Sequence, residues 1–144
     1  MTTELFRDDA YQVECETTVI ASNADGIMLA QTVFYPEGGG QPGDTGELEM
    51  AGQPSIEIID TRSGNDGSLL HIPAEGEALP PVGSTVTARI NWDRRYRHMR
   101  THTCLHLLCA LIPHDVTGGS ISLEKGRLDF DMSDAVDKPA LEKA

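Results

Sequence analysis

The sequence predicts an α+β protein, in which a small antiparallel β-barrel over residues 1–92 is followed by the start of a second domain over residues 93–144. Before residue 92, short runs rich in β-branched residues are separated by turns about every 8–12 residues, and no helical segment alternates with them. From Trp92 onward, the period of the apolar residues changes from about two to about 3.6. These observations favour strands first and a helix afterwards.

The expected strands of the barrel are short and end in turn-forming residues. A hairpin is expected from residues 11–22 and 27–35, because residues 23–26, Asn-Ala-Asp-Gly, form a turn sequence between them. Residues 74–81 contain two prolines and form a connection rather than a helix. The remaining strands are expected at residues 46–50, 55–61, 68–72 and 82–91.

A helix is expected over residues 94–111, with Asp93 as its N-cap and Pro113 just beyond its end. Gly118 and Gly119 then lead into a predicted hairpin, with its turn at residues 124–126. The two strands of this hairpin are expected at residues 120–123 and 128–132.

A second helix is expected from residue 134, capped by Ser133 or Asp134, to residue 144, where the sequence ends. A helix cut after two or three turns is an unusual end for a domain, because short helices depend on packing against the rest of a fold. We therefore expect the chain to be truncated at its C-terminus.

The amino-acid composition is that of a soluble globular protein, with 39% hydrophobic and 24% charged residues. No apolar run approaches the roughly 20 residues that cross a bilayer, and the N-terminus lacks the basic and apolar regions of a signal peptide. The three cysteines form no evident framework of pairs, which favours reduced thiols, and Cys15 in an expected strand is a packing residue. The expected location is therefore cytoplasmic.

The formal net charge of −12 is distributed unevenly along the chain. Residues 1–92 contain 3 basic and 15 acidic residues, whereas residues 93–144 contain 8 of each. Four arginines between residues 94 and 100 form a local basic patch. Two interpretations of this patch stay open: contact with the phosphates of a nucleic acid, or a solvated helix face.

His102 and His106 are the strongest candidates for a functional site. They are four residues apart in the expected helix, so their side chains lie on one face and can reach the same metal ion. The alternative is a pair of histidines without a ligand. Cys104 lies two residues from each and should point away from them. The other side of the helix is expected to pack through Leu105, Leu108, Cys109 and Leu111.

A glycine-rich loop between Phe34 and Gly46 is the second distinctive stretch. It contains five glycines and two prolines in thirteen residues, a composition that excludes regular secondary structure. Its backbone amides can bind an anion or a carboxylate, but the loop lacks the phosphate-binding and dinucleotide-binding patterns. The alternative is a long connection between strands of the barrel.

Three stretches carry a resemblance to a known family: the loop of residues 34–46, the segment of residues 93–108 with both histidines, and residues 118–130. In this order they resemble the alanyl-tRNA editing family, the free-standing deacylases similar to the editing domain of alanyl-tRNA synthetase. The resemblance extends from about Tyr11 onward. It implies a barrel like those of translation factors, followed by the start of an α/β editing core.

The resemblance implies an ATP-independent hydrolase that edits mischarged alanine tRNA in trans, by hydrolysing the ester that links serine or glycine to the tRNA. Members of the family hold zinc with two helix histidines and with a Cys and a His from a later Cys-x-x-x-His segment. His102 and His106 match the first two of these ligands. No Cys or His follows His114, so the second pair of ligands is not in this sequence.

Further roles near the histidines are expected from the same resemblance. Gln41 and Thr103 are expected to be catalytic, and the loop around Gln41 should line the zinc pocket. A serine substrate needs a partner for its hydroxyl, for which Thr103, Ser120 and Ser122 are equal candidates. No residue is an evident general base, so the 3′-terminal ribose of the tRNA is a candidate participant. Substrate-binding roles are expected for Gly39, Gly40, Ser120, Ser122 and Arg100.

Two other functions stay open from the sequence. One is a non-catalytic β-barrel binding module, in which the histidines are structural and the arginines bind a partner. The other is an unrelated metal-dependent hydrolase of a small ester or amide. Zinc suits either kind of hydrolase, because a bound zinc ion lowers the pKa of water to about 7.

Overall fold

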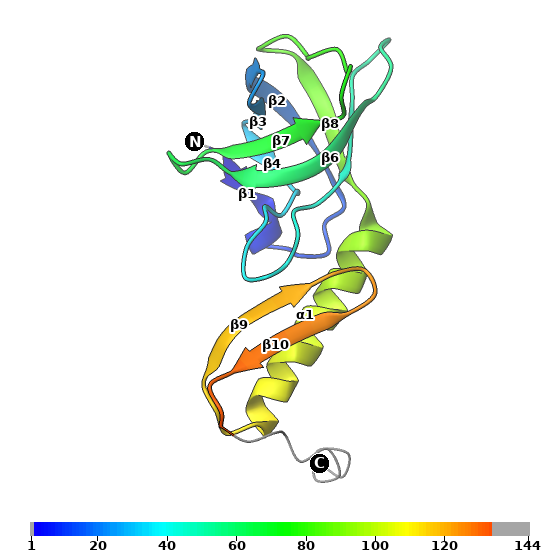
Figure 1. The fold of residues 1–144 in the computed structure, drawn as a ribbon. Helices are drawn as coiled ribbons and strands as arrows, with labels where there is room; N and C mark the ends of the chain where they lie inside the picture. The colour runs from blue at the N-terminus through cyan, green and yellow to red at the C-terminus, as the bar shows by residue number, and fades with distance from the viewer. Residues whose placement is uncertain (1, 134–144) are drawn as a thin grey trace. The chain divides into compact units, whose positions relative to one another are not determined.

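The structure is a computed structural model that describes residues 2–133 (Figure 1). The chain forms two compact units, which we call the barrel unit and the helix–hairpin unit. The barrel unit comprises the residues up to Gly38 together with Pro42–Arg95, and the helix–hairpin unit comprises Gly39–Gln41 together with the residues from Tyr96 onward. The predicted boundary after residue 92 lies within the barrel unit, and the tip of the glycine-rich loop belongs to the helix–hairpin unit.

Six strands of the barrel unit form a closed barrel in the order β2-β3-β7-β6-β5-β8. The barrel closes through the antiparallel pairing of β2 with β8, from Glu14 opposite Arg89 to Thr18 opposite Thr85. The predicted α+β class with an N-terminal antiparallel barrel is confirmed. The strands are β2 (Glu14–Asn23), β3 (Gly26–Leu29), β5 (Gly46–Glu49), β6 (Ile56–Ser63), β7 (Leu69–Pro73) and β8 (Thr85–Ile90).

Alternating side chains of these strands fill the barrel. Along β2, Cys15, Thr17 and Val19 are buried and the residues between them are exposed, which is the period of a strand with one face in a core. The prediction that Cys15 is a packing residue is confirmed. The core also contains Ile27, Leu29, Phe34, Leu48, Ile58, Val86 and Ala88, each at most 1% exposed.

The second strand of the first predicted hairpin is interrupted. β3 ends early, and a separate strand β4 (Gln31–Thr32) pairs in parallel with β1 (Thr3–Glu4), which leads into the 3-10 turn η1 (Leu5–Arg7). The Thr3 N–H donates to the Ala30 carbonyl at 2.9 Å. Elements this short have no periodic pattern, so the sequence did not predict β1 or η1.

His71 is completely buried in the barrel. Its Nδ1–H donates to the Ile27 carbonyl at 2.9 Å, and its Nε2 accepts from Thr32 Oγ1 at 2.8 Å. Burial lowers the pKa of His71 to about 4, because the interior of the barrel disfavours the charged imidazolium. The ring is therefore neutral at pH 7, and both of its nitrogens are hydrogen-bonded.

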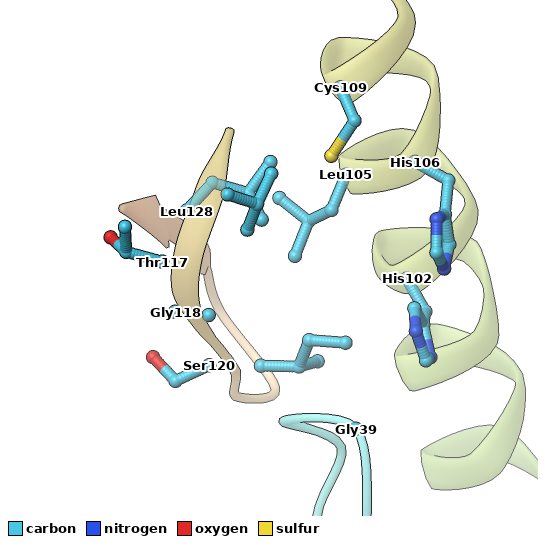
Figure 2. Close-up of a pocket in the computed structure, with 12 residues that line it drawn as sticks. Gly39, His102, Leu105, His106, Cys109, Thr117, Gly118, Ser120 and Leu128 are labelled. Carbon is cyan, nitrogen blue, oxygen red and sulfur yellow. The ribbon is translucent and has the colours of Figure 1, made fainter. Parts of the chain in front are cut away.

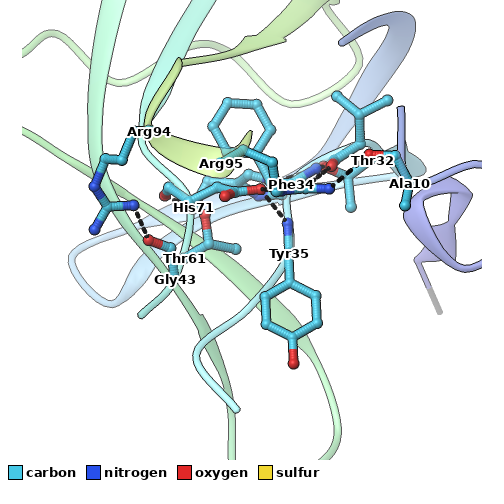
Figure 3. Close-up of polar contacts among 11 residues, drawn as sticks. Ala10, Thr32, Phe34, Tyr35, Gly43, Thr61, His71, Arg94 and Arg95 are labelled. Atoms are coloured by element: carbon cyan, nitrogen blue, oxygen red, sulfur yellow. Dashed lines mark hydrogen bonds and ion pairs between the residues drawn. The ribbon is translucent and has the colours of Figure 1, made fainter. Parts of the chain in front are cut away.

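A buried ion pair holds the base of the glycine-rich loop in the barrel unit (Figure 3). Arg95 is 2% exposed, donates through Nε to Asp44 Oδ2 at 2.7 Å, and contacts the same oxygen through Nη2. That oxygen also accepts from the Tyr35 N–H at 2.8 Å. Arg94 Nη1 donates to the Gly43 carbonyl at 2.6 Å. Two arginines of the predicted basic patch therefore make contacts within the barrel unit.

Helix α1 (Trp92–Leu111) starts one residue earlier than its predicted cap. The Arg94 N–H donates to Asn91 Oδ1 at 3.1 Å, so the N-cap is Asn91 and not the predicted Asp93. A capping side chain has to precede the helical residues, whereas Asp93 lies in the first turn. The acidic side chain still stands near the positive end of the helix dipole.

The hairpin of β9 (Val116–Ile121) and β10 (Gly126–Phe130) also begins earlier than predicted. Gly118 and Gly119 were expected to precede the strand, but they lie within β9 and pair with Asp129 and Leu128. Pairing with β10 overrides the low strand propensity of glycine.

The second predicted helix, residues 134–144, lies outside the described residues. Within residues 2–133, no helix is both long enough and apolar enough to span a membrane.

Candidate active site

A cavity of about 500 Å³ lies in the helix–hairpin unit (Figure 2). All of β9 lines it, together with Leu128 of β10, and the tip of the glycine-rich loop contributes Gly39. Helix α1 contributes His102, Leu105, His106 and Cys109. The two predicted metal ligands and the predicted loop are thus brought to one cavity, although 61 residues separate Gln41 from His102 in the sequence.

The four helix residues share one face of α1. Positions 102, 105, 106 and 109 follow the i, i+3, i+4, i+7 spacing of a helix face. The expectation that Leu105 and Cys109 lie on the side away from the histidines is therefore wrong. Leu108 and Leu111 do not line the cavity, but they are 39% and 47% exposed, so they are not buried by packing as expected. The same spacing was the signal in the sequence that could have placed Cys109 in the cavity. Cys104 is exposed and does not line the cavity.

The imidazole rings of His102 and His106 are stacked, with centroids 4.9 Å apart and planes inclined by 14°. Figure 2 shows both rings extending from the helix in the same direction. The pKa of His102 is lowered from its ordinary value, first by partial burial and second by the charge of His106. The neutral imidazole that this favours is the form that binds a metal ion.

Gln41 connects the loop to the histidine pair. Its side chain is 4% exposed, and its Oε1 lies 3.0 Å from His102 Nδ1. A buried amide oxygen at this distance is a hydrogen-bond partner of the imidazole. The predicted catalytic residue Gln41 therefore reaches the site through His102.

Backbone geometry holds the loop tip against β9. Gly39 and Gly40 have φ angles of +58° and +78°, in the left-handed region that favours glycine. The Ile121 N–H donates to the Gly40 carbonyl at 2.8 Å, and a Cβ atom on Gly40 would lie 2.7 Å from the Gly119 carbonyl oxygen. Only glycine fits at position 40 without a shift of the backbone.

The other predicted site residues differ in their relation to the cavity. Thr103 is exposed and does not line the cavity. Ser120 lines it, but Figure 2 shows its hydroxyl pointing away from the rings. Ser122 Oγ accepts from the Lys125 N–H at 3.1 Å within the hairpin turn. Arg100 is exposed, and its guanidinium carbon lies 5.9 Å from the centroid of the Tyr96 ring.

The donor set can be compared with the needs of a zinc ion. Two neutral imidazoles on one helix face supply two ligands, as zinc sites commonly require. Among residues 2–133, no group of three or more His, Cys, Asp or Glu side chains could hold a metal ion. His98 is buried and does not line the cavity. The described residues therefore supply two candidate zinc ligands, fewer than the three or four protein ligands of a complete site.

Comparison with known proteins identifies the family. Residues 4–94 match the model of a family described as tRNA synthetases class II (A), which is more than half of the chain. The chain belongs to this family. The resemblance to the alanyl-tRNA editing family is confirmed as well, because the chain is similar over most of its length to proteins of that name.

Two of these relatives are separate alanyl-tRNA editing proteins. The chain is 37% identical over 137 residues to the alanyl-tRNA editing protein AlaX-M of Pyrococcus horikoshii, covering 90% of this chain and 61% of that protein. It is 38% identical over 136 residues to the AlaX-M protein of Saccharolobus solfataricus, covering 92% of this chain and 57% of that protein. The chain thus spans about three fifths of the length of these two relatives.

The same similarity extends to a larger enzyme. An alanine–tRNA ligase of Saccharolobus islandicus is 38% identical over 136 residues, which is 90% of this chain and 15% of the ligase. One stretch of residues is therefore shared between a separate editing protein and a small part of a synthetase.

Proposed function

We propose that the protein is an aminoacyl-tRNA deacylase that removes serine or glycine from mischarged alanine tRNA in trans. The observation that carries the proposal is the cavity, which is lined by two stacked histidines of α1 and by Gly39 of the glycine-rich loop, with His102 also in contact with Gln41 of that loop. The names of the related editing proteins supply the reaction and the class of substrate. The reaction adds one water to the ester, breaks its carbonyl carbon–oxygen bond, and releases the amino acid and the uncharged tRNA.

The proposed metal is zinc, with His102 and His106 as two of its ligands. When bound, zinc lowers the pKa of a coordinated water or polarises the ester carbonyl. The Cys and the second His that complete this site in the family are not found after His114 in this sequence. Metal binding and activity therefore have to be measured on the chain as it is.

The walls of the cavity suit an aminoacyl ester. Leu105, Val116 and Leu128 give one part an apolar lining, while the histidines and the loop tip give the other polar groups. Backbone N–H groups of Gly39 and Gly40 are the candidates to stabilise the oxyanion that forms on the ester carbonyl. Rigid backbone donors suit this role because they need little reorganisation during the reaction.

The tRNA would be held in part by the remaining arginines of the basic patch. Arg97 and Arg100 are exposed on α1, whereas Arg94 and Arg95 contact the glycine-rich loop and its base. Phosphate contacts by one or two arginines predict binding that weakens as salt concentration rises.

The test is deacylation of seryl-tRNA for alanine by the wild-type chain and by His102→Ala. Loss of a metal ligand should lower the rate by at least about 100-fold, and a chelator should have the same effect on the wild type. His114→Ala is the matched control, because His114 is an exposed histidine that does not line the cavity.

Each possible result decides between the functions. Wild-type activity that survives both His102→Ala and chelation would contradict the metal-dependent mechanism. No deacylation above background would contradict the activity proposed for this chain. Equal hydrolysis of a small aminoacyl ester without tRNA would favour the unrelated hydrolase.

A further inference from the structure

Gln41, which is buried, contacts the partly buried His102, and the chemistry of this contact has a direct consequence for the imidazole ring. The atom of Gln41 that faces His102 Nδ1 is the side-chain carbonyl oxygen Oε1, at 3.0 Å. A carbonyl oxygen only accepts hydrogen bonds, so the hydrogen of a neutral ring has to be on Nδ1. The lone pair of the ring is then on Nε2.

We propose that Gln41 is a positioning residue, whose carbonyl oxygen holds His102 in the Nδ1–H tautomer and thereby leaves Nε2 as the atom that binds the metal. This inference rests on the metal site proposed above. Metal-bound histidines generally donate their second ring nitrogen to a hydrogen-bond acceptor, which fixes both the tautomer and the ring orientation. In this chain the acceptor comes from the glycine-rich loop.

The backbone before Gln41 and the burial of its side chain explain why a glutamine can have this role. Long, flexible side chains lose rotamer entropy when they are held, so an exposed glutamine would not fix an imidazole. Gln41 instead follows Gly40, whose carbonyl accepts from the Ile121 N–H at 2.8 Å. Its side chain is also 4% exposed, so it is confined to a buried position next to the ring.

The stacking of the two rings and the hydrogen bond to Gln41 together fix the orientation of the His102 ring. The ring planes of His102 and His106 differ by only 14°, and in Figure 2 the rings lie side by side. Rotation of the His102 ring would break both the stacking and the hydrogen bond to Gln41. The hydrogen bond therefore selects one ring orientation as well as one tautomer.

The alternative role for Gln41 is direct contact with the substrate. A residue that only contacts substrate would leave the tautomer of His102 in the metal-free, substrate-free protein unchanged. The tautomer is therefore the measurement that separates the two roles.

The experiment records long-range ¹H–¹⁵N correlation spectra of the full chain with ¹⁵N-labelled histidine, without metal, at pH 8, where imidazole is neutral. His102→Asn assigns the His102 signals. Wild-type His102 should have its hydrogen on Nδ1. Gln41→Leu should shift it toward Nε2, and Gln41→Glu, which keeps an acceptor, should restore it to Nδ1. Gln53→Leu is the matched control, because Gln53 is an exposed glutamine far from the cavity in sequence.

Metal affinity gives a second measurement. Gln41→Leu should weaken the binding of zinc, measured by competition with a chelator, by about 10–100-fold, as removal of an outer hydrogen-bond partner does elsewhere. Gln41→Glu should bind zinc at least as tightly as the wild type. Gln53→Leu should leave the affinity unchanged.

The outcomes separate this inference from the proposed function. Wild-type His102 with its hydrogen on Nε2, or a tautomer that Gln41→Leu does not change, would overturn the positioning role even in an active deacylase. An Nδ1–H ring in a protein that binds no zinc would overturn the metal site and with it the ligand role of Nε2.

Discussion

The two units of the molecule bury their apolar side chains to different extents. In the barrel unit, Ile27 and Leu48 are completely buried. In the helix–hairpin unit, Leu107, Leu111 and Leu123 are 62%, 47% and 50% exposed. The cluster of buried apolar residues that forms the core lies in the barrel unit, whereas the candidate site lies in a unit where several leucines are exposed. We expect substitutions in the barrel to change stability and substitutions around the cavity to change binding and catalysis.

The comparisons with known proteins divide the molecule in a similar way. The match to the synthetase family ends at residue 94, soon after α1 begins, whereas His102, His106 and the hairpin come later in the chain. The related editing proteins are similar over both regions. The barrel therefore identifies the broader family, and the segment after it carries the groups proposed for the reaction.

The largest effect on stability is expected from the buried ion pair of the barrel unit. Asp44→Ala would leave the Arg95 guanidinium, 2% exposed, without its counterion, and should lower the free energy of unfolding by about 3–5 kcal/mol. Urea unfolding followed by circular dichroism measures this loss. Arg62→Ala is the control, since Arg62 pairs with Asp60 while 60% exposed and should contribute at most about 1 kcal/mol. Equal losses in the two variants would contradict the assignment.

Two leucine substitutions compare the units directly. Leu48→Ala removes a completely buried side chain from the barrel and should cost about 2–5 kcal/mol. Leu107→Ala removes one that is 62% exposed in the helix–hairpin unit and should change the free energy of unfolding by less than about 0.5 kcal/mol. Chemical denaturation of both variants under the same conditions tests the difference. A cost for Leu107→Ala that matches Leu48→Ala would show that this leucine is buried in solution.

The effect of His71 on stability develops only as the pH falls. The pKa of His71 falls from 6.5 in a free histidine to about 4 in the barrel, so the unfolded chain takes up a proton before the folded protein does. The neutral ring contributes its full stability above pH 6.5. That contribution, roughly 3 kcal/mol, should be lost as the pH falls toward 4.

The measurement for His71 is the free energy of unfolding of the wild type and of His71→Gln between pH 7 and pH 4. Acidic groups also titrate in this range, so the difference between the two proteins isolates the histidine. His114→Gln serves as the control, because His114 is exposed. A difference between wild type and His71→Gln that does not change with pH would exclude the buried neutral ring.

Much of the fold follows from local patterns in the sequence. Turn residues such as those at residues 23–26 separate short β-branched runs, and these became barrel strands, while the change of period near Trp92 marked helix α1. The spacing of His102 and His106 was enough to place both on one helix face, because 3.6 residues make one turn. The same helical spacing places Cys109, three residues after His106, on the face that lines the cavity. The prediction put it on the opposite face because the spacing was applied to the two histidines alone.

Other features depend on residues that are distant in the sequence, and only the tertiary structure decided them. Closure of the barrel pairs Glu14 with Arg89, and the parallel pairing of β1 with β4 joins runs too short to have a pattern. The burial of Arg95 against Asp44 and the contact of Gln41 with His102 span 51 and 61 residues. Periodicity reports which face a side chain occupies, but it contains no information on which distant side chain meets it there.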